Sequence, residues 1–193
     1  MFDPPHIGHL ILASEAAWQL GLDELRLVVC ARPPHRGEGW LPPETRLQLV
    51  AQATAAYPKL VASRVELDRP GPSYTLDTLD AFVAHEPETA FWLILGADQL
   101  TSFARWHGPE RIVGLARLAV ASRDGARTAD LLAVADRVAP GRVDWLEMPT
   151  VGISSTMIRE RIASGQPVRH VVSPPVDDLL AAVGLFRGQR QLP

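Results

Sequence analysis

Lysine is almost absent from this chain. Lys59 is the only lysine among the 19 lysine and arginine residues of a 193-residue sequence. The sequence contains no G-x-x-x-x-G-K-[ST] segment, and no lysine is placed to form a Schiff base. P-loop nucleotide binding and pyridoxal-phosphate chemistry are therefore excluded. Any phosphate must be recognised by arginine, histidine or backbone N–H groups.

Cysteine, long apolar runs and excess positive charge are scarce as well. Cys30 is the single cysteine, which excludes an internal disulfide and predicts a cytoplasmic protein. No segment approaches the roughly 20 apolar residues of a membrane span, and the first residues lack the basic region of a secretory signal. The formal net charge of −3 predicts no surface for a nucleic acid polymer. We therefore expect neither a membrane nor a nucleic acid polymer as a partner.

The length and the order of apolar segments predict one α/β domain over residues 1–193. Apolar strand-like runs alternate with amphipathic helical ones, which is typical of a Rossmann-like, doubly wound, mostly parallel sheet with helices on both faces. The unbroken apolar run at 91–95 predicts a central strand covered on both faces, with Trp92 in the core. A proline-rich stretch at 33–43 predicts a long loop, and the C-terminal part, about 152–186, is predicted to be helical. We expect helices at 8–20, 43–56, 76–85, 109–114, 128–138, 155–164 and 175–183, and strands at 25–31, 61–67, 91–95, 118–121 and 143–147.

Two histidines flank a glycine at the start of the first predicted helix. Residues 2–10 read FDPPHIGHL, so His6 and His9 lie three positions apart and can share one face of the helix. A helix start carries about half a positive charge and several unpaired N–H groups, and both attract phosphate. Gly8 would let the backbone approach that phosphate closely. Taken alone, H-x-G-H also fits a fragment of a metal site or a surface turn.

A hydroxyl-rich segment near the other end of the chain points to the same ligand. Residues 152–162 read GISSTMIRERI, in which Ser154 or Ser155 fits as the N-cap of a helix. Arg159, one turn into that helix, can reach an anion bound at the helix start. Ordinary capping also explains the serines. The presence of both segments in one domain-sized chain favours a shared nucleoside triphosphate.

Together these segments resemble the signatures of the nucleotidyltransferase superfamily, and more closely those of bacterial nicotinate-mononucleotide adenylyltransferases. Besides F-D-P-x-H-x-G-H and I-S-S-T-x-I-R, the resemblance is carried by PPHR at 33–36, PSYTLDTL at 72–79, and GAD at 96–98 followed by Trp106. These pieces fall in the family's order and cover almost the whole chain. The resemblance implies transfer of the adenylyl group of ATP to nicotinate mononucleotide, which gives nicotinate adenine dinucleotide and pyrophosphate in NAD biosynthesis.

The resemblance also implies the roles of individual residues. His6, His9 and Arg159 would be catalytic, and an ordinary histidine pKa near ~6.5 would let ATP phosphates hold a proton on the imidazoles. Mg²⁺ would be held mainly by ATP phosphates and water, with no metal ligands from the protein. The residues expected to bind ATP are Gly8, Ile153, Ser154, Ser155 and Thr156. Those expected to bind the mononucleotide are His35, Arg36, Ser73, Tyr74, Thr75, Asp98, Trp106 and His107.

Selection of the mononucleotide would depend on the group carried by its pyridine ring. In the resembled family, main-chain N–H groups recognise the ring carboxylate of nicotinate, and they correspond to Thr75 and His107 here. Two donors would be mispaired with the NH₂ of a nicotinamide ring. Trp106 would stack on the ring. Asp98 either binds ribose, as the resemblance favours, or caps the next helix.

The chain departs from the resembled family at its start. Members begin with an apolar strand and a Gly-Gly-[Ser/Thr] turn, whereas Met1 directly precedes Phe2 here. We expect that first strand, which would lie in the middle of the sheet, to be missing from this chain. We expect its neighbours to lack a partner, and we hypothesise that the natural protein starts upstream.

Other functions stay open. A pantetheine-phosphate adenylyltransferase would share His9, although it usually carries threonine at the first histidine position and lacks SYT at 73–75. A nicotinamide-mononucleotide or dual-specific adenylyltransferase differs only in the choice of ring substituent. A non-catalytic nucleotide-binding regulator would keep binding but lose turnover. Assembly into a homo-oligomer is a further open point.

Overall fold

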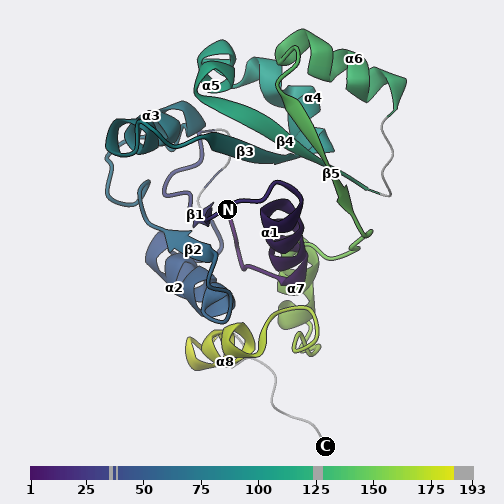
Figure 1. The fold of residues 1–193 in the computed structure, drawn as a ribbon. Helices are drawn as coiled ribbons and strands as arrows, with labels where there is room; N and C mark the ends of the chain where they lie inside the picture. The colour runs from purple at the N-terminus through teal and green to yellow at the C-terminus, as the bar shows by residue number, and fades with distance from the viewer. Residues whose placement is uncertain (35–36, 38, 124–127, 185–193) are drawn as a thin grey trace, which may run out of the picture.

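The computed structural model describes residues 1–34, 37, 39–123 and 128–184. Within them, helices and strands alternate along most of the chain, as the apolar pattern predicts (Figure 1). The helices are α1 (Ile7–Gln19), α2 (Pro43–Thr54), α3 (Thr75–His85), α4 (Ala97–Ser102), the 3-10 helix η1 (Phe103–Arg105), α5 (Pro109–Leu115), α6 (Ala129–Val138), α7 (Ser155–Ala163) and α8 (Pro174–Ala182). The strands are β1 (Leu25–Val28), β2 (Leu60–Ser63), β3 (Phe91–Gly96), β4 (Ala116–Arg123) and β5 (Val143–Met148).

Every strand pair is parallel, and the described strands form two sheets. One sheet pairs β1 with β2, and the other has the order β3-β4-β5. Among the described strands, β1 pairs with β2 alone and β3 pairs with β4 alone. The described strands therefore do not join into one continuous sheet.

Strand β4 contributes buried side chains to the apolar clusters on both faces of the larger sheet. Leu118 and Val120 are fully buried in a cluster with residues of α3 to α6, whereas Ala119 is fully buried in a second cluster with residues of α1, α2, α7 and α8. Alternate side chains of a strand point to opposite faces, so helices cover the sheet on both sides. The doubly wound α/β fold expected from the sequence is therefore present.

Three local expectations were wrong. Strand β3 is not central, because β4 is the middle strand of its sheet and β3 lies at the edge of the described strands, although alternate β3 side chains pack against apolar clusters on both faces. Trp92 is half-buried rather than enclosed, and its indole N–H donates to Asp144 at 2.8 Å. The expected strand 61–67 ends at Ser63, because the backbone N–H groups of Leu67 and Asp68 donate to the carbonyl of Arg64 and turn the chain.

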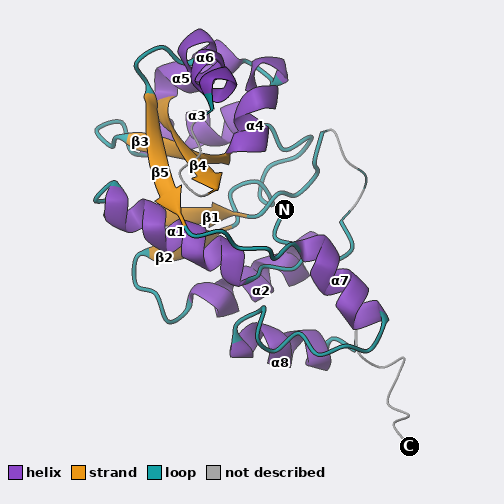
Figure 2. Cartoon of the chain, turned by 90° about the vertical axis from the view of Figure 1, so that its right-hand side faces the viewer, coloured by secondary structure: helices purple, strands orange, loops and turns teal. Residues whose placement is uncertain are grey.

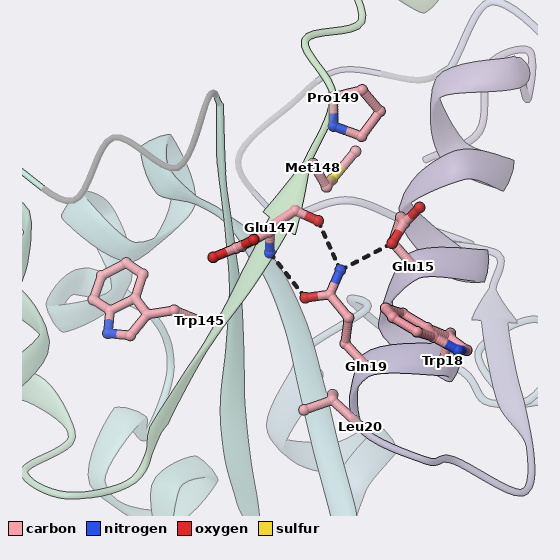
Figure 3. Close-up of a pocket in the computed structure, with 8 residues that line it drawn as sticks. All are labelled: Glu15, Trp18, Gln19, Leu20, Trp145, Glu147, Met148 and Pro149. Carbon is pink, nitrogen blue, oxygen red and sulfur yellow. Dashed lines mark hydrogen bonds between the residues drawn. The ribbon is translucent and has the colours of Figure 1, made fainter.

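The far end of α1 meets the outer edge of β5 (Figures 2 and 3). The side-chain amide of Gln19 donates to the carbonyl of Glu147 at 2.7 Å and accepts from its N–H at 2.9 Å. A neighbouring β-strand would bind the N–H and C=O of Glu147 in the same way, so the Gln19 amide takes the place of a strand at this residue. The two hydrogen bonds lie within a hollow of about 910 Å³ that also includes the exposed ring of Trp18.

Among the described residues, no helix has the length and apolarity needed to cross a bilayer.

Candidate functional site

His6 and His9 meet face to face at the start of α1. His6 is the N-cap, and its backbone N–H donates to Nδ1 of His9 at 3.2 Å. The ring centroids lie 3.7 Å apart with an interplanar angle of 30°. Because Nδ1 of His9 accepts a hydrogen bond, the neutral ring carries its proton on Nε2. The sequence correctly predicted that the two rings share one side of the helix start.

Burial changes the acid–base character of both rings. Desolvation lowers the pKa of His6 to about 4. It lowers the pKa of His9 to about 3, and the neighbouring His6 adds to the shift. The expectation of an ordinary histidine pKa is therefore wrong for the ligand-free chain, in which both rings are neutral at pH 7.

Gly8 has a more immediate neighbour than the phosphate expected from the sequence. A Cβ at Gly8 would lie 3.0 Å from Nδ1 of His6 and 3.4 Å from a methyl group of Val151. That nitrogen of His6 is itself buried without a partner among the described residues. Glycine at this position therefore leaves room for the His6 ring against the helix.

Helix α7 is hydrogen-bonded to the segment that precedes His6. Nη1 of Arg159 donates to the carbonyl of Asp3 at 2.8 Å, and the Ser155 hydroxyl donates to the carbonyl of Pro4 at 2.8 Å. These contacts span more than 150 positions of sequence. They place the guanidinium of Arg159 beside the segment that leads into α1. A ligand shared by the two segments stays a prediction.

The other hydroxyl groups of α7 are also engaged. Ser154 is the N-cap and accepts from the N–H of Met157 at 3.2 Å, which decides between the two serines expected there. Thr156 accepts from Nη2 of Arg159 at 3.0 Å. Ile153 precedes the cap and packs, half-buried, against the cluster that contains α1. The hydroxyl groups of Ser154, Ser155 and Thr156 therefore all have hydrogen-bond partners within the chain.

Two buried charged residues that the sequence analysis missed hold the segment before α1. The Asp3 carboxylate accepts from the N–H groups of Trp40 at 2.6 Å and Leu41 at 3.0 Å. Arg46 is 1% exposed and donates to the carbonyls of Leu41 and Met1, each at 3.0 Å. Most of these partners are backbone groups about 40 positions away, so no local sequence signal marks the two residues.

The residues expected to bind a mononucleotide gather at the start of α3. Tyr74 is the N-cap of α3 and Thr75 is its first residue, so the N–H of Thr75 has no partner within the helix. The Tyr74 and His107 rings lie 4.5 Å apart between centroids at 30°. Trp106, half-buried, packs its ring on Phe103 at 5.3 Å. The structure thus brings His107 against Tyr74 at the start of α3, with Trp106 as the preceding residue in the chain.

Ser73 forms hydrogen bonds to backbone groups of the chain that follows β1. Its hydroxyl oxygen accepts from the N–H groups of Ala31 and Arg32, each at 3.0 Å, and its own N–H donates to the carbonyl of Arg32 at 2.8 Å. Ser73 therefore ties the chain leaving β1 to the start of α3. His35 and Arg36, also expected to bind the mononucleotide, lie outside the described residues.

Asp98 lies in the first turn of α4, at the carboxyl end of β3. It is exposed, and a Cβ at Gly96 would meet its Oδ1 at 2.6 Å, so the carboxylate folds back over Gly96. Its side chain does not cap α4. The helix-capping alternative left open by the sequence is therefore wrong, and the carboxylate remains available at the sheet edge.

The described residues alone do not form a metal-binding cluster. Nowhere in 1–34, 37, 39–123 and 128–184 do three His, Cys, Asp or Glu side chains come together as ligands. Near the histidine pair, the Asp3 carboxylate already accepts two backbone N–H groups. A second hollow, of about 460 Å³, lies along α1 beside Arg169 and His170, but its lining does not include His6, His9 or Arg159.

Comparison with known sequences identifies relatives over nearly the full length. A family profile described as "Cytidylyltransferase-like" matches residues 1–161. A protein of Roseiflexus sp. (strain RS-1), named "Probable nicotinate-nucleotide adenylyltransferase", is 41% identical over 189 residues, covering 96% of this chain and 94% of that protein. A protein of Thermus thermophilus with the same name is 40% identical over 186 residues, covering 96% of this chain and 95% of that protein.

Solved structures give the same fold. The Plasmodium falciparum nicotinic acid mononucleotide adenylyltransferase complexed with NaAD superposes with a TM-score of 0.79, covering 97% of this chain and 94% of that chain. The same protein complexed with APC superposes with a TM-score of 0.77. Sequence identity is 15% in both comparisons, so they establish the architecture alone.

Proposed function

The chain belongs to the cytidylyltransferase-like family and, within it, to the nicotinate-nucleotide adenylyltransferases, and from this premise we propose that it transfers the adenylyl group of ATP to nicotinate mononucleotide. The products are nicotinate adenine dinucleotide and pyrophosphate. The observation that carries this proposal is the hydrogen bonding of Arg159 and Ser155 to the segment that leads into His6 and His9. It gives one triphosphate access to a guanidinium, two imidazoles and a helix start.

The reaction requires alignment rather than proton removal. A phosphate oxygen of the mononucleotide attacks the α-phosphorus of ATP, and the bond from that phosphorus to the β-bridging oxygen breaks. The attacking phosphate is already an anion at neutral pH, so it needs no general base. Holding two mutually repelling anions in line can contribute about 7–11 kcal/mol to catalysis. The chain's donors then stabilise the charge that develops on the leaving pyrophosphate.

The histidine pair would act first as neutral donors. His9 presents an Nε2–H because its Nδ1 is occupied by the backbone of His6. Burial lowers the pKa of both histidines, and a phosphate anion next to the rings acts in the opposite direction because it stabilises the protonated form. The pKa of both rings therefore rises when the triphosphate binds. Arg159, already oriented by Asp3 and Thr156, would hold the outer phosphates, together with Ser154, Ser155, Gly8 and Ile153 around them.

The acceptor would lie against the start of α3. The N–H groups of Thr75 and His107 would bind the ring carboxylate, Trp106 would stack on the ring, and Asp98 would bind ribose. Ser73 and Tyr74 would also contact the mononucleotide; Ser73 is held by its hydrogen bonds to Ala31 and Arg32, and Tyr74 by its ring contact with His107. His35 and Arg36 are proposed to contact the mononucleotide phosphate.

A divalent cation, Mg²⁺ in our proposal, would be bound to triphosphate oxygens and water, because the described side chains offer no ligand cluster of their own. Once bound, it supplies neutralisation of the phosphate charge. We further propose that residues 1–193 act as one domain, since contacts between α7 and the segment before α1 close the site. The cytoplasmic location and the oligomeric state stay predictions.

Pyrophosphate release tests the proposal. The protein is mixed with ATP, Mg²⁺ and one acceptor at a time: nicotinate mononucleotide, nicotinamide mononucleotide or phosphopantetheine. We expect release with nicotinate mononucleotide. Preference for the amide would overturn the substrate, release with phosphopantetheine alone would indicate the sister activity, and binding of ATP without release would favour a regulator.

A further inference from the structure

Arg69 lies behind the start of α3, in the segment between β2 and that helix. Its side chain is 24% exposed. Nη2 donates to the carbonyl of Tyr74 at 3.4 Å and to the hydroxyl oxygen of Thr78 at 3.5 Å, and it lies 3.9 Å from the Asp77 carboxylate. Nη1 is buried without a partner in the part of the chain that the structure describes. No sequence pattern discussed above assigns this arginine a task.

A buried carboxylate completes this arrangement. Glu66 is 8% exposed, and its Oε1 accepts from the Thr78 hydroxyl at 2.8 Å. Thr78 can therefore accept from Arg69 while it donates to Glu66, which joins a guanidinium to a carboxylate through one hydroxyl. Hydrogen bonds in such a chain polarise and strengthen one another. The two charges are thus fixed by a side chain that belongs to the first turn of α3.

The carbonyl held by Arg69 belongs to the peptide that joins Tyr74 to Thr75. This carbonyl also accepts from the N–H of Thr78 at 3.3 Å. A peptide group is planar, and in the trans form its C=O and N–H point in opposite directions. Donors on the Tyr74 oxygen therefore fix the direction of the Thr75 N–H. A cationic donor on the oxygen also makes that N–H a stronger donor.

We propose that Arg69 is a positioning residue that acts through the Tyr74–Thr75 peptide to aim the Thr75 N–H at a ring carboxylate and so favours the acidic mononucleotide over its amide. This inference rests on the function proposed above and deepens it. The carboxylate accepts the N–H and gains from the positive charge behind it, whereas the amide gains less because it is neutral. Loss of Arg69 should therefore affect the acid more than the amide.

The experiment compares three variants for binding and turnover. Arg69→Met keeps the length of the side chain and removes its charge and donors, and Arg69→Lys keeps the charge without the planar fork. Arg64→Met is the matched control, because Arg64 is 53% exposed in the same segment and pairs only with Asp68 and Glu44 among the described residues. Calorimetry gives the Kd of each mononucleotide without ATP, and pyrophosphate release gives KM and kcat.

For Arg69→Met we expect Kd and KM for nicotinate mononucleotide to rise about tenfold, with kcat within about twofold and the amide nearly unaffected. The acid-to-amide preference then falls about tenfold, Arg69→Lys recovers part of it, and Arg64→Met keeps it. An equal loss for both mononucleotides, or a fall in kcat alone, would show that Arg69 is only structural. If Arg69→Met does not fold, Thr78→Val removes the linking hydroxyl and must lower the same preference.

The unsubstituted protein separates this inference from the proposed function. If it releases pyrophosphate with nicotinate mononucleotide but Arg69→Met keeps the wild-type preference, only the positioning role is overturned. If it releases pyrophosphate with neither mononucleotide and binds neither, the proposed function fails and the inference fails with it.

Discussion

At the scale of the residue, burial decides what the two histidines can do. The sequence places His6 and His9 on one side of a helix start, and the structure confirms that placement. It could not predict their protonation, because the low pKa of each ring comes mainly from burial in the folded chain. The structural roles of Asp3 and Arg46 could not be predicted either, because both side chains bind backbone groups that are far away in sequence.

Substitution of His9 and Trp106 should separate the two halves of the site. His9→Ala removes a donor to the developing charge, so we expect kcat to fall about 10²–10³-fold with little change in mononucleotide Kd. Trp106→Ala removes a stacking surface and should raise the Kd about tenfold, with a smaller effect on kcat. Steady-state kinetics and calorimetry measure both parameters. Trp18→Ala, which removes an 80%-exposed ring at the other end of α1, should change neither. Equal effects of His9→Ala and Trp106→Ala on one parameter would contradict the division.

The buried rings should also make the fold sensitive to acid. The pKa of His6 falls from 6.5 to about 4 on folding, so between these values the unfolded chain binds more protons than the folded one. The free energy of unfolding should therefore decrease as the pH falls from about 6.5 toward 4. Urea unfolding at several pH values measures this slope.

His6→Phe keeps a buried ring that does not titrate, so the slope should become shallower in that variant. His85→Gln is the control, because His85 lies on the surface at the end of α3. An unchanged slope in His6→Phe would show that the buried imidazole does not contribute.

At the scale of the element, the long periodic helices were predictable and the short elements were not. Most helices begin and end within a few residues of the expected positions, because each has a clear apolar face and a capping or proline start. Helices α4 and η1 were missed, since residues 97–105 are too few to show a helical period. The turn at Arg64 was also missed, because it is formed by backbone hydrogen bonds whereas the alternation of apolar and polar side chains at 61–67 indicates a continuous strand.

The turn before α5 provides a test of how tightly α3 must be held. Gly108 has φ +62°, and a Cβ there would lie 2.7 Å from Cδ2 of Leu76 on α3. Gly108→Ala should lower the free energy of unfolding by about 1–2 kcal/mol for the left-handed backbone and by about 1–3 kcal/mol more for the clash. It should also weaken mononucleotide binding, because Thr75 and His107 flank this contact.

Gly141 gives the matched control. It has φ +66° but no heavy atom within 4 Å of an added Cβ, so Gly141→Ala carries only the backbone penalty. Urea unfolding and calorimetry compare the two variants. Equal destabilisation, or unchanged mononucleotide binding in Gly108→Ala, would show that the Leu76 contact does not set the position of α3.

At the scale of the whole molecule, β4 joins two apolar clusters that lie on opposite faces of one sheet. The sequence predicted this doubly wound arrangement from the alternation of strands and helices. It could not predict which strand would be central, because the apolar run of β3 is more continuous than that of β4. Centrality follows from strand order, which is a property of the assembled fold.

Shared packing on β4 predicts one cooperative unfolding transition. Leu49 and Leu118 are each fully buried, in different clusters. Leu49→Ala and Leu118→Ala should each lower the free energy of unfolding by about 2–5 kcal/mol. Far-ultraviolet circular dichroism and tryptophan fluorescence should report the same midpoint in both variants. Separate midpoints for the two probes would show that the clusters unfold independently.

The amide of Gln19 has a consequence for how copies of the protein behave in solution. An open strand edge invites a strand from another molecule, and such pairing can continue without limit. Because the Gln19 amide already binds the N–H and C=O of Glu147, a strand from another molecule cannot pair with these two groups of β5. Together with Pro149, which follows the strand and has no N–H to donate, this amide leaves fewer backbone groups at the end of β5 for pairing with a second copy of the chain.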